Sequence, residues 1–239
     1  MKSLSKISMK KHLLPYLASV VLLFTLSSCL KNDENTNPNI AALSVIHASP
    51  GLQKFDFVVN NQRINSSPFD YSQRLPYFNI YGGTRTFGIY KVQSTDSIKL
   101  GSFEAKSDNY YSIYVIGQAT NPQFLVLTDS LTQPSAAKAN LRFLNLSPDA
   151  PALSLSLSQN EGQDSTLFSN LNYKSHSAFT GIKGGKTYTF KIKSADQTTV
   201  ATVENVNVES GRIYTIWSKG LINSTNDTTK VGIIIQPNI

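Results

Sequence analysis

The chain has 239 residues, of which 40% are hydrophobic, 10% aromatic and only 15% charged. This composition is typical of a globular protein, because disordered chains are poorer in apolar residues and richer in charge. A single Cys excludes a disulfide framework and a Cys-rich metal site. The net charge of +7 falls to +3 when the four lysines of residues 1–12 are left out, so we expect no nucleic-acid partner.

The N-terminus has the features of an export signal. Residues 1–12 hold four Lys and no acidic residue, and the 14 residues 13–26 that follow are uncharged. A helix needs about 20 apolar residues to cross a bilayer. This run is shorter, so it indicates a signal peptide rather than an anchor helix.

The end of this segment contains the only Cys of the chain. Leu26-Ser27-Ser28-Cys29 resembles the lipobox of bacterial lipoproteins, in which a branched residue and two small residues precede a lipid-carrying Cys. The resemblance implies that residues 1–28 are removed and that Cys29 anchors the protein to a membrane by its lipid. An ordinary secretory signal that ends near a Cys is the alternative.

The polar segment 29–41 that follows has the composition of a flexible tether. Asp33 and Glu34 within it resemble the export signal of surface lipoproteins in the Bacteroidota. This resemblance implies an outer-membrane location on the cell surface, and the periplasmic face is the alternative.

The rest of the chain consists of two copies of one repeated unit. Residues 43–50 align with residues 141–148, an offset of 98, and residues 111–117 align with residues 214–220, an offset of 103. Matches between these two blocks are Tyr71 with Tyr173 and residues 80–83 with residues 182–185. The repeat predicts two domains, 42–133 and 139–239, joined by the linker 134–138.

The apolar residues of each copy alternate with a period of two, as in half-buried strands. Residues 55–59 and residues 153–158 are clear examples. In the first copy we predict seven strands, at residues 42–48, 54–60, 76–81, 85–92, 97–104, 109–117 and 123–128. This number and spacing predict an all-β fold of two tandem immunoglobulin-like β-sandwich domains.

Several of the repeated segments also resemble a known family. Ser-Pro at residues 49–50 and 147–148, Gly-Gly at residues 82–83 and 184–185, and a Tyr-Thr-Ile segment at residues 214–216 are similar to the bacterial domain-of-unknown-function family 4397. The resemblance covers residues 42–239. It implies exported, often tandem β-domains and no assigned activity.

We predict no catalytic residues, no metal site and no cofactor, and therefore no enzyme. His47 and His176 share no Cys or carboxylate cluster, no Gly-x-Ser-x-Gly occurs, and residues 181–187 lack the spacing of a phosphate loop. Both histidines are predicted to be solvated or at strand edges. A hydrolase with two close carboxylates is the alternative that sequence leaves open.

A short motif, Asp-Ser/Thr followed by an aliphatic residue or Thr, recurs four times. It is similar to the O-glycosylation site of exported Bacteroidota proteins. The candidate acceptors, all expected in loops, are Ser97, Ser130, Ser165 and Thr228.

The first copy has 14 aromatic residues and the second has 8. Because the two cores should need similar numbers, we expect part of the surplus to lie on the surface of the first domain. Tyr77, Tyr81 and Tyr110 are the candidates for stacking on a sugar ring or anchoring a protein partner. The alternative is that these tyrosines are half-buried strand residues.

These features together predict a lipid-anchored, non-catalytic envelope protein that displays two β-sandwich domains for binding or adhesion. The alternatives are a glycan-binding accessory of a nutrient-uptake system and a purely structural envelope lipoprotein.

Overall fold

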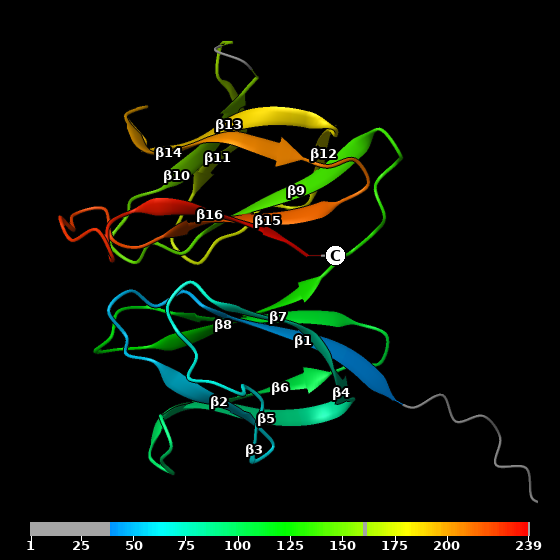
Figure 1. The fold of residues 1–239 in the computed structure, drawn as a ribbon, viewed down its shortest axis with the longest axis vertical. Coiled ribbons are helices and arrows are strands. Elements are labelled where there is room, and N and C mark those ends of the chain that lie inside the picture. The colour runs from blue at the N-terminus through cyan, green and yellow to red at the C-terminus, as the bar shows by residue number, and fades with distance from the viewer. Residues whose placement is uncertain (1–38, 160–161, 239) are drawn as a thin grey trace, which may run out of the picture. The chain divides into compact units, whose positions relative to one another are not determined.

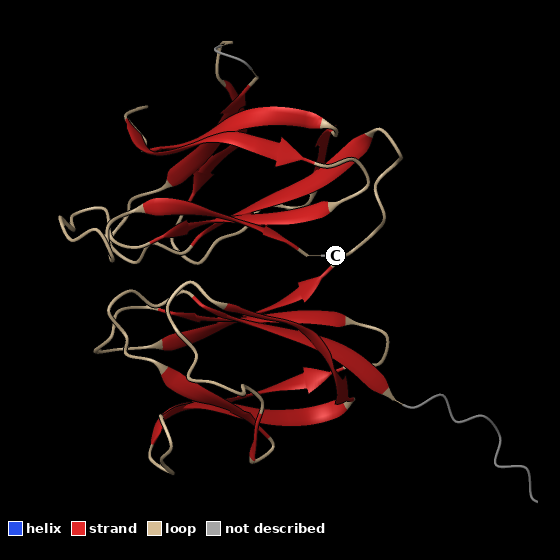
Figure 2. Ribbon diagram, in the orientation of Figure 1, coloured by secondary structure: helices blue, strands red, loops and turns tan. Residues whose placement is uncertain are grey.

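The computed structural model describes residues 39–159 and 162–238, which belong to one compact unit beginning at Asn39. Within these residues the regular elements are sixteen β-strands, with no helix (Figure 1, Figure 2). The strands form four sheets of four strands each. The predicted all-β class is confirmed. The signal segment 1–28, Cys29 and residues 30–38 of the tether lie outside the described residues.

The first half of the chain is a β-sandwich. Its strands are β1 (Ile40–His47), β2 (Phe55–Val59), β3 (Gln62–Arg63), β4 (Arg74–Tyr81), β5 (Gly83–Lys91), β6 (Ser97–Ala105), β7 (Tyr110–Ile116) and β8 (Gln123–Asp129). One sheet has the order β4-β1-β7-β8, and the other has the order β3-β2-β5-β6. The seven predicted strands are all present, and the two-residue β3 is added to them.

The second half is a similar β-sandwich. Its strands are β9 (Lys138–Asn145), β10 (Leu153–Ser158), β11 (Ser165–Leu171), β12 (Thr180–Lys183), β13 (Lys186–Lys193), β14 (Thr199–Val208), β15 (Ile213–Lys219) and β16 (Gly232–Pro237). The sheet orders are β12-β9-β15-β16 and β11-β10-β13-β14. Two tandem sandwiches are therefore present, as the repeat predicted.

The two sandwiches share their strand order and their register. β1 and β7 pair in parallel with Ala42 opposite Tyr110, and β9 and β15 pair in parallel with Asn140 opposite Ile213. These pairs are separated by the same offsets, 98 and 103, as the repeats in the sequence. A residue in one sandwich can therefore be compared directly with its counterpart in the other.

Each sandwich has its own hydrophobic core. In β2 the alternate residues Phe55, Phe57 and Val59 are buried in the first core, and in β13 the alternate residues Tyr188, Phe190 and Ile192 are buried in the second. This is the period of two that the sequence displays, because successive strand residues point to opposite faces of a sheet.

A third apolar cluster joins the two sandwiches. It contains Ile46 and Tyr114 from the sheet β4-β1-β7-β8, and Leu144 and Trp217 from the sheet β12-β9-β15-β16. These two sheets, here called the inner sheets, are thus buried on both faces in their central strands. The other two, here called the outer sheets, each keep one face toward solvent.

Candidate functional site

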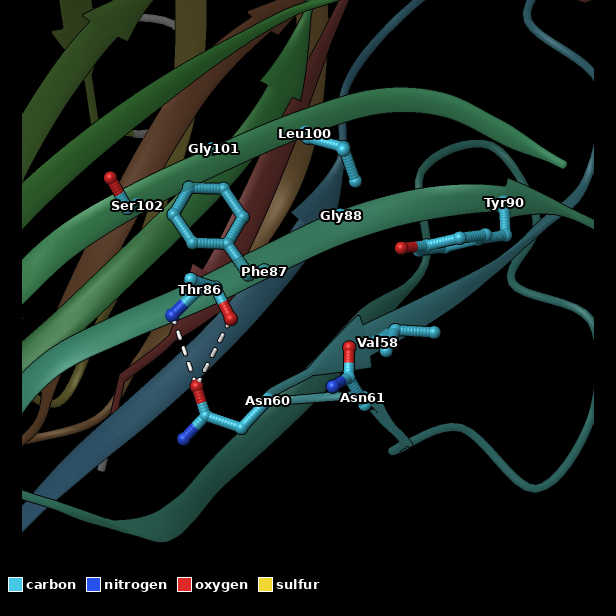
Figure 3. Close-up of a pocket in the computed structure, with 10 residues that line it drawn as sticks. All are labelled: Val58, Asn60, Asn61, Thr86, Phe87, Gly88, Tyr90, Leu100, Gly101 and Ser102. Atoms are coloured by element: carbon cyan, nitrogen blue, oxygen red, sulfur yellow. Dashed lines mark hydrogen bonds between the residues drawn. The ribbon is translucent and has the colours of Figure 1, made fainter. Parts of the chain in front are cut away.

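The outer sheet of the first sandwich carries an open hollow on its solvent face (Figure 3). Its volume is about 480 Å³, which is within the range of about 300–1,000 Å³ found for small-molecule pockets. The residues that line it are Val58, Asn60, Asn61, Thr86, Phe87, Gly88, Tyr90, Leu100, Gly101 and Ser102. We call it the Gly88 hollow.

The hollow exists because a glycine interrupts a row of outward-facing side chains on β5. Phe87 and Ile89 face the core, so Gly88 faces outward, opposite Val58 of β2 and Leu100 of β6. A Cβ atom on Gly88 would lie 2.7 Å from Leu100 Cδ2 and 3.1 Å from Tyr90 Cε2. Glycine therefore lets these two side chains lie close against the strand.

Leu100 and Tyr90 form the apolar part of the hollow. Leu100 is 58% exposed, one of the three large hydrophobic side chains counted as exposed among the described residues. Tyr90 is half-buried, and Figure 3 shows its ring edge-on, with the hydroxyl directed along β5 toward Gly88. Exposed apolar side chains grouped in a concave site favour a ligand-binding role.

The polar rim of the hollow comes from the tight turn between β2 and β3. Asn60 and Asn61 both have positive φ, 45° and 65°, as a two-residue hairpin turn requires, and Asn tolerates this conformation well. The Asn60 side-chain oxygen accepts hydrogen bonds from the Thr86 amide (3.0 Å) and hydroxyl (3.3 Å). These bonds fix the turn over the end of the hollow.

A second hollow of about 420 Å³ adjoins the first and shares Val58, Asn61 and Tyr90 with it. Asp56 and Arg63 help to line it, and the buried Asp56 carboxylate lies 3.5 Å from the Arg63 guanidinium. Burial alone would raise the pKa of Asp56, but hydrogen bonds from the Gln93 amide and the Asn65 side chain, together with Arg63, outweigh it and lower the pKa. Asp56 is thus an ionised, fully engaged group.

The second sandwich fills the equivalent positions with charge. The strand register places Lys191 where the first sandwich has Gly88, and Lys193 where it has Tyr90. Both lysines bind Asp164, at 2.9 Å and 2.8 Å. The second outer sheet also has a hollow, of about 470 Å³, but Lys191 and Glu204 line it. The uncharged lining of the Gly88 hollow is therefore a feature of the first copy.

The three tyrosines proposed from sequence do not form one exposed cluster. Tyr81 is 70% exposed and Tyr110 is 40% exposed, but Tyr77 is largely covered. Its hydroxyl donates to Asp129 (2.6 Å) and accepts from Asn238 of the second sandwich (3.2 Å), while its ring packs edge-on against Tyr110.

The additional aromatic rings of the first copy, part of which we expected on its surface, are likewise mostly buried. Phe78, Phe103 and Phe124 pack against the first core, and Tyr114 is buried between the sandwiches. The assumption of equal core demand was wrong, because the first core uses more rings than the second.

The four candidate glycosylation residues are all exposed. Ser130 and Thr228 lie in loops, whereas Ser97 and Ser165 are the first residues of β6 and β11. Their preceding Asp residues differ: Asp129 is buried in an ion pair with Arg142, while the Asp164 side chain is 20% exposed.

The described residues contain no group of three or more His, Cys, Asp or Glu side chains suited to a metal ion. His176 is exposed, but His47 is completely buried on β1, an inner strand of its sheet, which corrects the expectation of a solvated or strand-edge side chain. Its ring packs on Phe55 (4.5 Å between centroids) and against Tyr71, and burial lowers its pKa to about 4. Over this part of the chain, no helix has the length and hydrophobicity to cross a bilayer.

The sequence contains one signal for the Gly88 hollow. Gly88 and Gly101 lie inside β5 and β6, and an isolated strand glycine often marks a close approach to the backbone. The tyrosine count drew attention to β4 and β7 instead.

Among solved structures, three bacterial proteins resemble this chain at low similarity. CBMbc, a family CBM26 module of Eubacterium rectale Amy13K in complex with maltoheptaose, is 9% identical, with 81% of this chain and 95% of that chain covered and a TM-score of 0.26. The Bacillus anthracis TIE protein is 15% identical, with 75% of this chain and 34% of that chain covered and a TM-score of 0.25.

The third, a streptococcal virulence factor described as binding alpha-glucan, is 8% identical, with 79% and 97% covered and a TM-score of 0.24. Scores this low carry no argument about function. No match is found among curated proteins.

Residues 41–156, which span the first sandwich together with β9 and part of β10, match the model of the family described as Domain of unknown function (DUF4397).

Proposed function

We propose that this protein is a lipid-anchored envelope protein that binds a ligand, without catalysis, in the Gly88 hollow. The observation that carries the proposal is the contrast between the two copies. The hollow of the first copy has no charged residue in its lining, whereas the hollow on the equivalent sheet of the second copy, about 470 Å³ in volume, is lined by Lys191 and Glu204.

The chemistry of the lining supports binding rather than catalysis. The groups around the hollow are amides, hydroxyls and apolar side chains, which can hold and orient a ligand. The Asp56 carboxylate belongs to the adjoining hollow and is engaged by Asn65, Gln93 and Arg63. A general acid or base needs a free proton site within reach of its substrate.

The anchor in this proposal is Cys29. The lipobox-like Leu26-Ser27-Ser28 before it and the polar segment after it support a lipidated N-terminus followed by a tether. Two or three acyl chains on one residue give stable membrane attachment, which a single chain does not. We place the protein at the outer membrane, on the cell surface, with the periplasmic face as the alternative.

Membrane fractionation of cells that produce the full chain tests the anchor. Wild type is expected in the membrane fraction, and Cys29→Ser in the soluble fraction. Ser27→Ala, which keeps a small residue in the segment, is the matched control and is expected to stay in the membrane fraction. Retention of Cys29→Ser in the membrane would contradict the anchor.

NMR titration tests the ligand site. The ¹⁵N-labelled chain from residue 30 onward is mixed in turn with neutral oligosaccharides, acidic oligosaccharides, nucleosides, amino acids and short peptides. We expect one class to shift the amide signals of Thr86, Gly88 and Tyr90. If no class shifts them, the proposed binding function is wrong.

A purely structural envelope role is the second candidate, and the shared apolar cluster between the inner sheets favours it. That cluster buries Trp217 and Tyr114 completely and makes the pair of sandwiches a single block. A structural role predicts that none of the five ligand classes shifts the signals around Gly88.

A further inference from the structure

We propose that the ligand of the Gly88 hollow is a neutral saccharide, with one sugar ring lying against Tyr90. This inference rests on the proposed function, since it names the ligand class of that same site. It is argued from three properties of the hollow: its aromatic wall, its hydrogen-bonding rim and its lack of charge.

The wall is formed by Tyr90 and Leu100. A Cβ on Gly88 would come within 3.1 Å of the Tyr90 ring, so the ring lies close over the strand at the position where a side chain is missing. Sugar rings present flat apolar C–H faces together with hydroxyl groups, and an aromatic side chain with an apolar body and a polar tip suits them. Leu100 extends the apolar surface beside it.

The rim offers hydrogen-bonding groups of both kinds. Asn60 uses its side-chain oxygen on Thr86, and Figure 3 shows its amide nitrogen directed to the other side. Asn61 and Ser102 are exposed at the edges of the hollow. An amide and a hydroxyl can each donate and accept, which matches sugar hydroxyls that do both.

The charge of the hollow selects against ionic ligands. None of its ten lining residues is Asp, Glu, Lys or Arg, and Asp56 and Arg63 in the adjoining hollow lie 3.5 Å from each other. An acidic or basic ligand would have to give up its hydration here without an opposite charge in return. The matching partner is therefore uncharged.

The size and position of the site favour a chain of sugars over a peptide. The two hollows share Val58, Asn61 and Tyr90 and so form one continuous surface with room for more than one sugar unit. They lie over the face of the sheet, on β2 and the central strand β5, whereas a peptide that adds a strand needs a free sheet edge.

Calorimetric titration with neutral hexasaccharides of glucose, xylose and mannose, alongside oligogalacturonate as an acidic probe, tests the inference. Tyr90→Ala removes the wall and is expected to weaken binding of the neutral ligand at least tenfold. Tyr81→Ala is the matched control, because Tyr81 is an exposed tyrosine of the same sandwich outside the hollow. It is expected to leave the affinity within a factor of two.

A filling variant provides a second, independent measurement. Gly88→Ala places a methyl group 2.7 Å from Leu100 Cδ2, 2.9 Å from the Lys99 backbone oxygen and 3.1 Å from Tyr90 Cε2. The two side chains must shift to accept it, and we expect the change to weaken binding as well. Thermal unfolding of each variant shows whether the fold is kept. If Gly88→Ala does not fold, Tyr90→Lys, which introduces the residue type of the second copy at that position, replaces it.

The outcomes separate the two proposals. Binding of oligogalacturonate alone, or of a peptide or nucleoside at the Gly88 amide, would overturn the saccharide inference and keep the binding function. Loss of saccharide binding in Tyr81→Ala but not in Tyr90→Ala would overturn this site. No ligand of any class at the hollow would overturn both.

Discussion

Arg142 of the second sandwich forms an ion pair with Asp129 of the first. Arg142 Nη2 lies 2.6 Å from Asp129 Oδ1, and the two side chains are only 3% and 0% exposed. The contact is a charge pair rather than a well-aligned hydrogen bond. It lies between the two inner sheets, beside the apolar cluster that contains Trp217.

Neighbouring polar groups bind other atoms of both side chains. Asp129 Oδ2 accepts hydrogen bonds from the hydroxyls of Tyr77 (2.6 Å) and Ser112 (2.5 Å). Arg142 Nε donates to Thr215 Oγ1 (2.9 Å), and the Arg142 guanidinium also lies over the Phe179 ring. Additional hydrogen bonds of this kind offset part of the cost of burying two charges.

The pair is asymmetric although the sandwiches are similar. The register places Ser44 at the position of Arg142, and Asn238 at the position of Asp129. Two first sandwiches packed in the same way would therefore bury two unpaired carboxylates, and two second sandwiches would bury two unpaired guanidiniums. The ion pair thus favours the packing of unlike copies.

The first prediction concerns the stability of this contact. Asp129→Asn leaves the Arg142 charge buried without a partner and is expected to lower the free energy of unfolding by about 3–5 kcal/mol. Arg142→Ser, which leaves the Asp129 charge without its partner, is expected to lower the free energy of unfolding by a similar amount. Both replacements use the residue of the other copy, Asn238 or Ser44, so each side chain is acceptable to a related fold.

Urea unfolding of the two single variants and of the double variant measures the coupling. We expect the double variant to be more stable than the sum of the single effects predicts, by about 1–3 kcal/mol, because it removes both charges together. Additive effects would mean that the two charges do not interact.

The second prediction concerns the cooperativity of the two sandwiches. The single Trp of the chain, Trp217, is buried between the inner sheets, with its indole N–H bonded to Gln236 (3.1 Å). Its fluorescence therefore reports on the shared cluster. Ile46→Ala, a change in the first sandwich, should lower the free energy of unfolding by about 2–5 kcal/mol and shift the Trp217 transition with it.

Circular dichroism and fluorescence recorded on the same samples provide the check. One transition with coincident midpoints is expected for wild type and variant, since the cluster contains residues from both sandwiches. A Trp217 midpoint that does not respond to Ile46→Ala would show that the sandwiches unfold independently.

The third prediction concerns pH and His47. Burial lowers the pKa of His47 from 6.5 to about 4 in the folded protein, and this effect outweighs the opposing charge of Asp70. Between these values the unfolded chain binds a proton that the folded chain excludes. The stability from the neutral ring is therefore fully present above pH 6.5 and is lost as the pH falls toward 4, by about 3 kcal/mol in all.

Denaturant titrations at pH 7, 5.5 and 4 measure this loss. His47→Asn is the matched variant, because Asn145 occupies the equivalent position and its side chain is fully bonded there. The variant should be nearly independent of pH in this window. The carboxylates with lowered pKa, such as Asp56, lose their contribution below this window. If the free energy of unfolding of His47→Asn depended on pH as strongly as that of wild type, His47 would not be the source of the pH dependence.

The sequence predicted the strands because the physics that determines them is local. The alternation of Phe55, Phe57 and Val59 follows directly from which face of β2 is buried, and the repeat carried the same pattern to the second sandwich. The turns are local as well: Asn60 and Asn61 adopt the positive φ values that a two-residue hairpin needs.

The packing between the sandwiches was not predicted, although a trace of it is present in the sequence. β1 and β9 are apolar at successive positions, as in Val45-Ile46 and Phe143-Leu144, which is typical of strands buried on both faces. Which two sheets meet, and that Arg142 finds Asp129, depends on residues far apart in the chain. No local pattern encodes such a pairing.

The Gly88 hollow was missed for a similar reason. A hollow depends on which residues surround the position that lacks a side chain. Here they are Val58 on β2 and Leu100 on β6, which lie opposite Gly88. Its recognition needs the register of three strands. The number of tyrosines in the first copy predicted Tyr77 as a ligand-stacking residue. In the structure Tyr77 instead takes part in the contact between the sandwiches.

The last prediction concerns glycosylation, which stays a proposal from the sequence motif. Mass spectrometry of peptides from the native protein should find glycans on Ser97, Ser165 and Thr228, which are exposed. Ser130 differs, because Asp129 of its motif is buried against Arg142 and a transferase acting on the folded chain cannot reach that carboxylate. We therefore expect Ser130 to be unmodified in wild type. Modification of Ser130 would mean that the transferase acts before the sandwiches pack, and a protein without glycans at any of the four residues would contradict the motif.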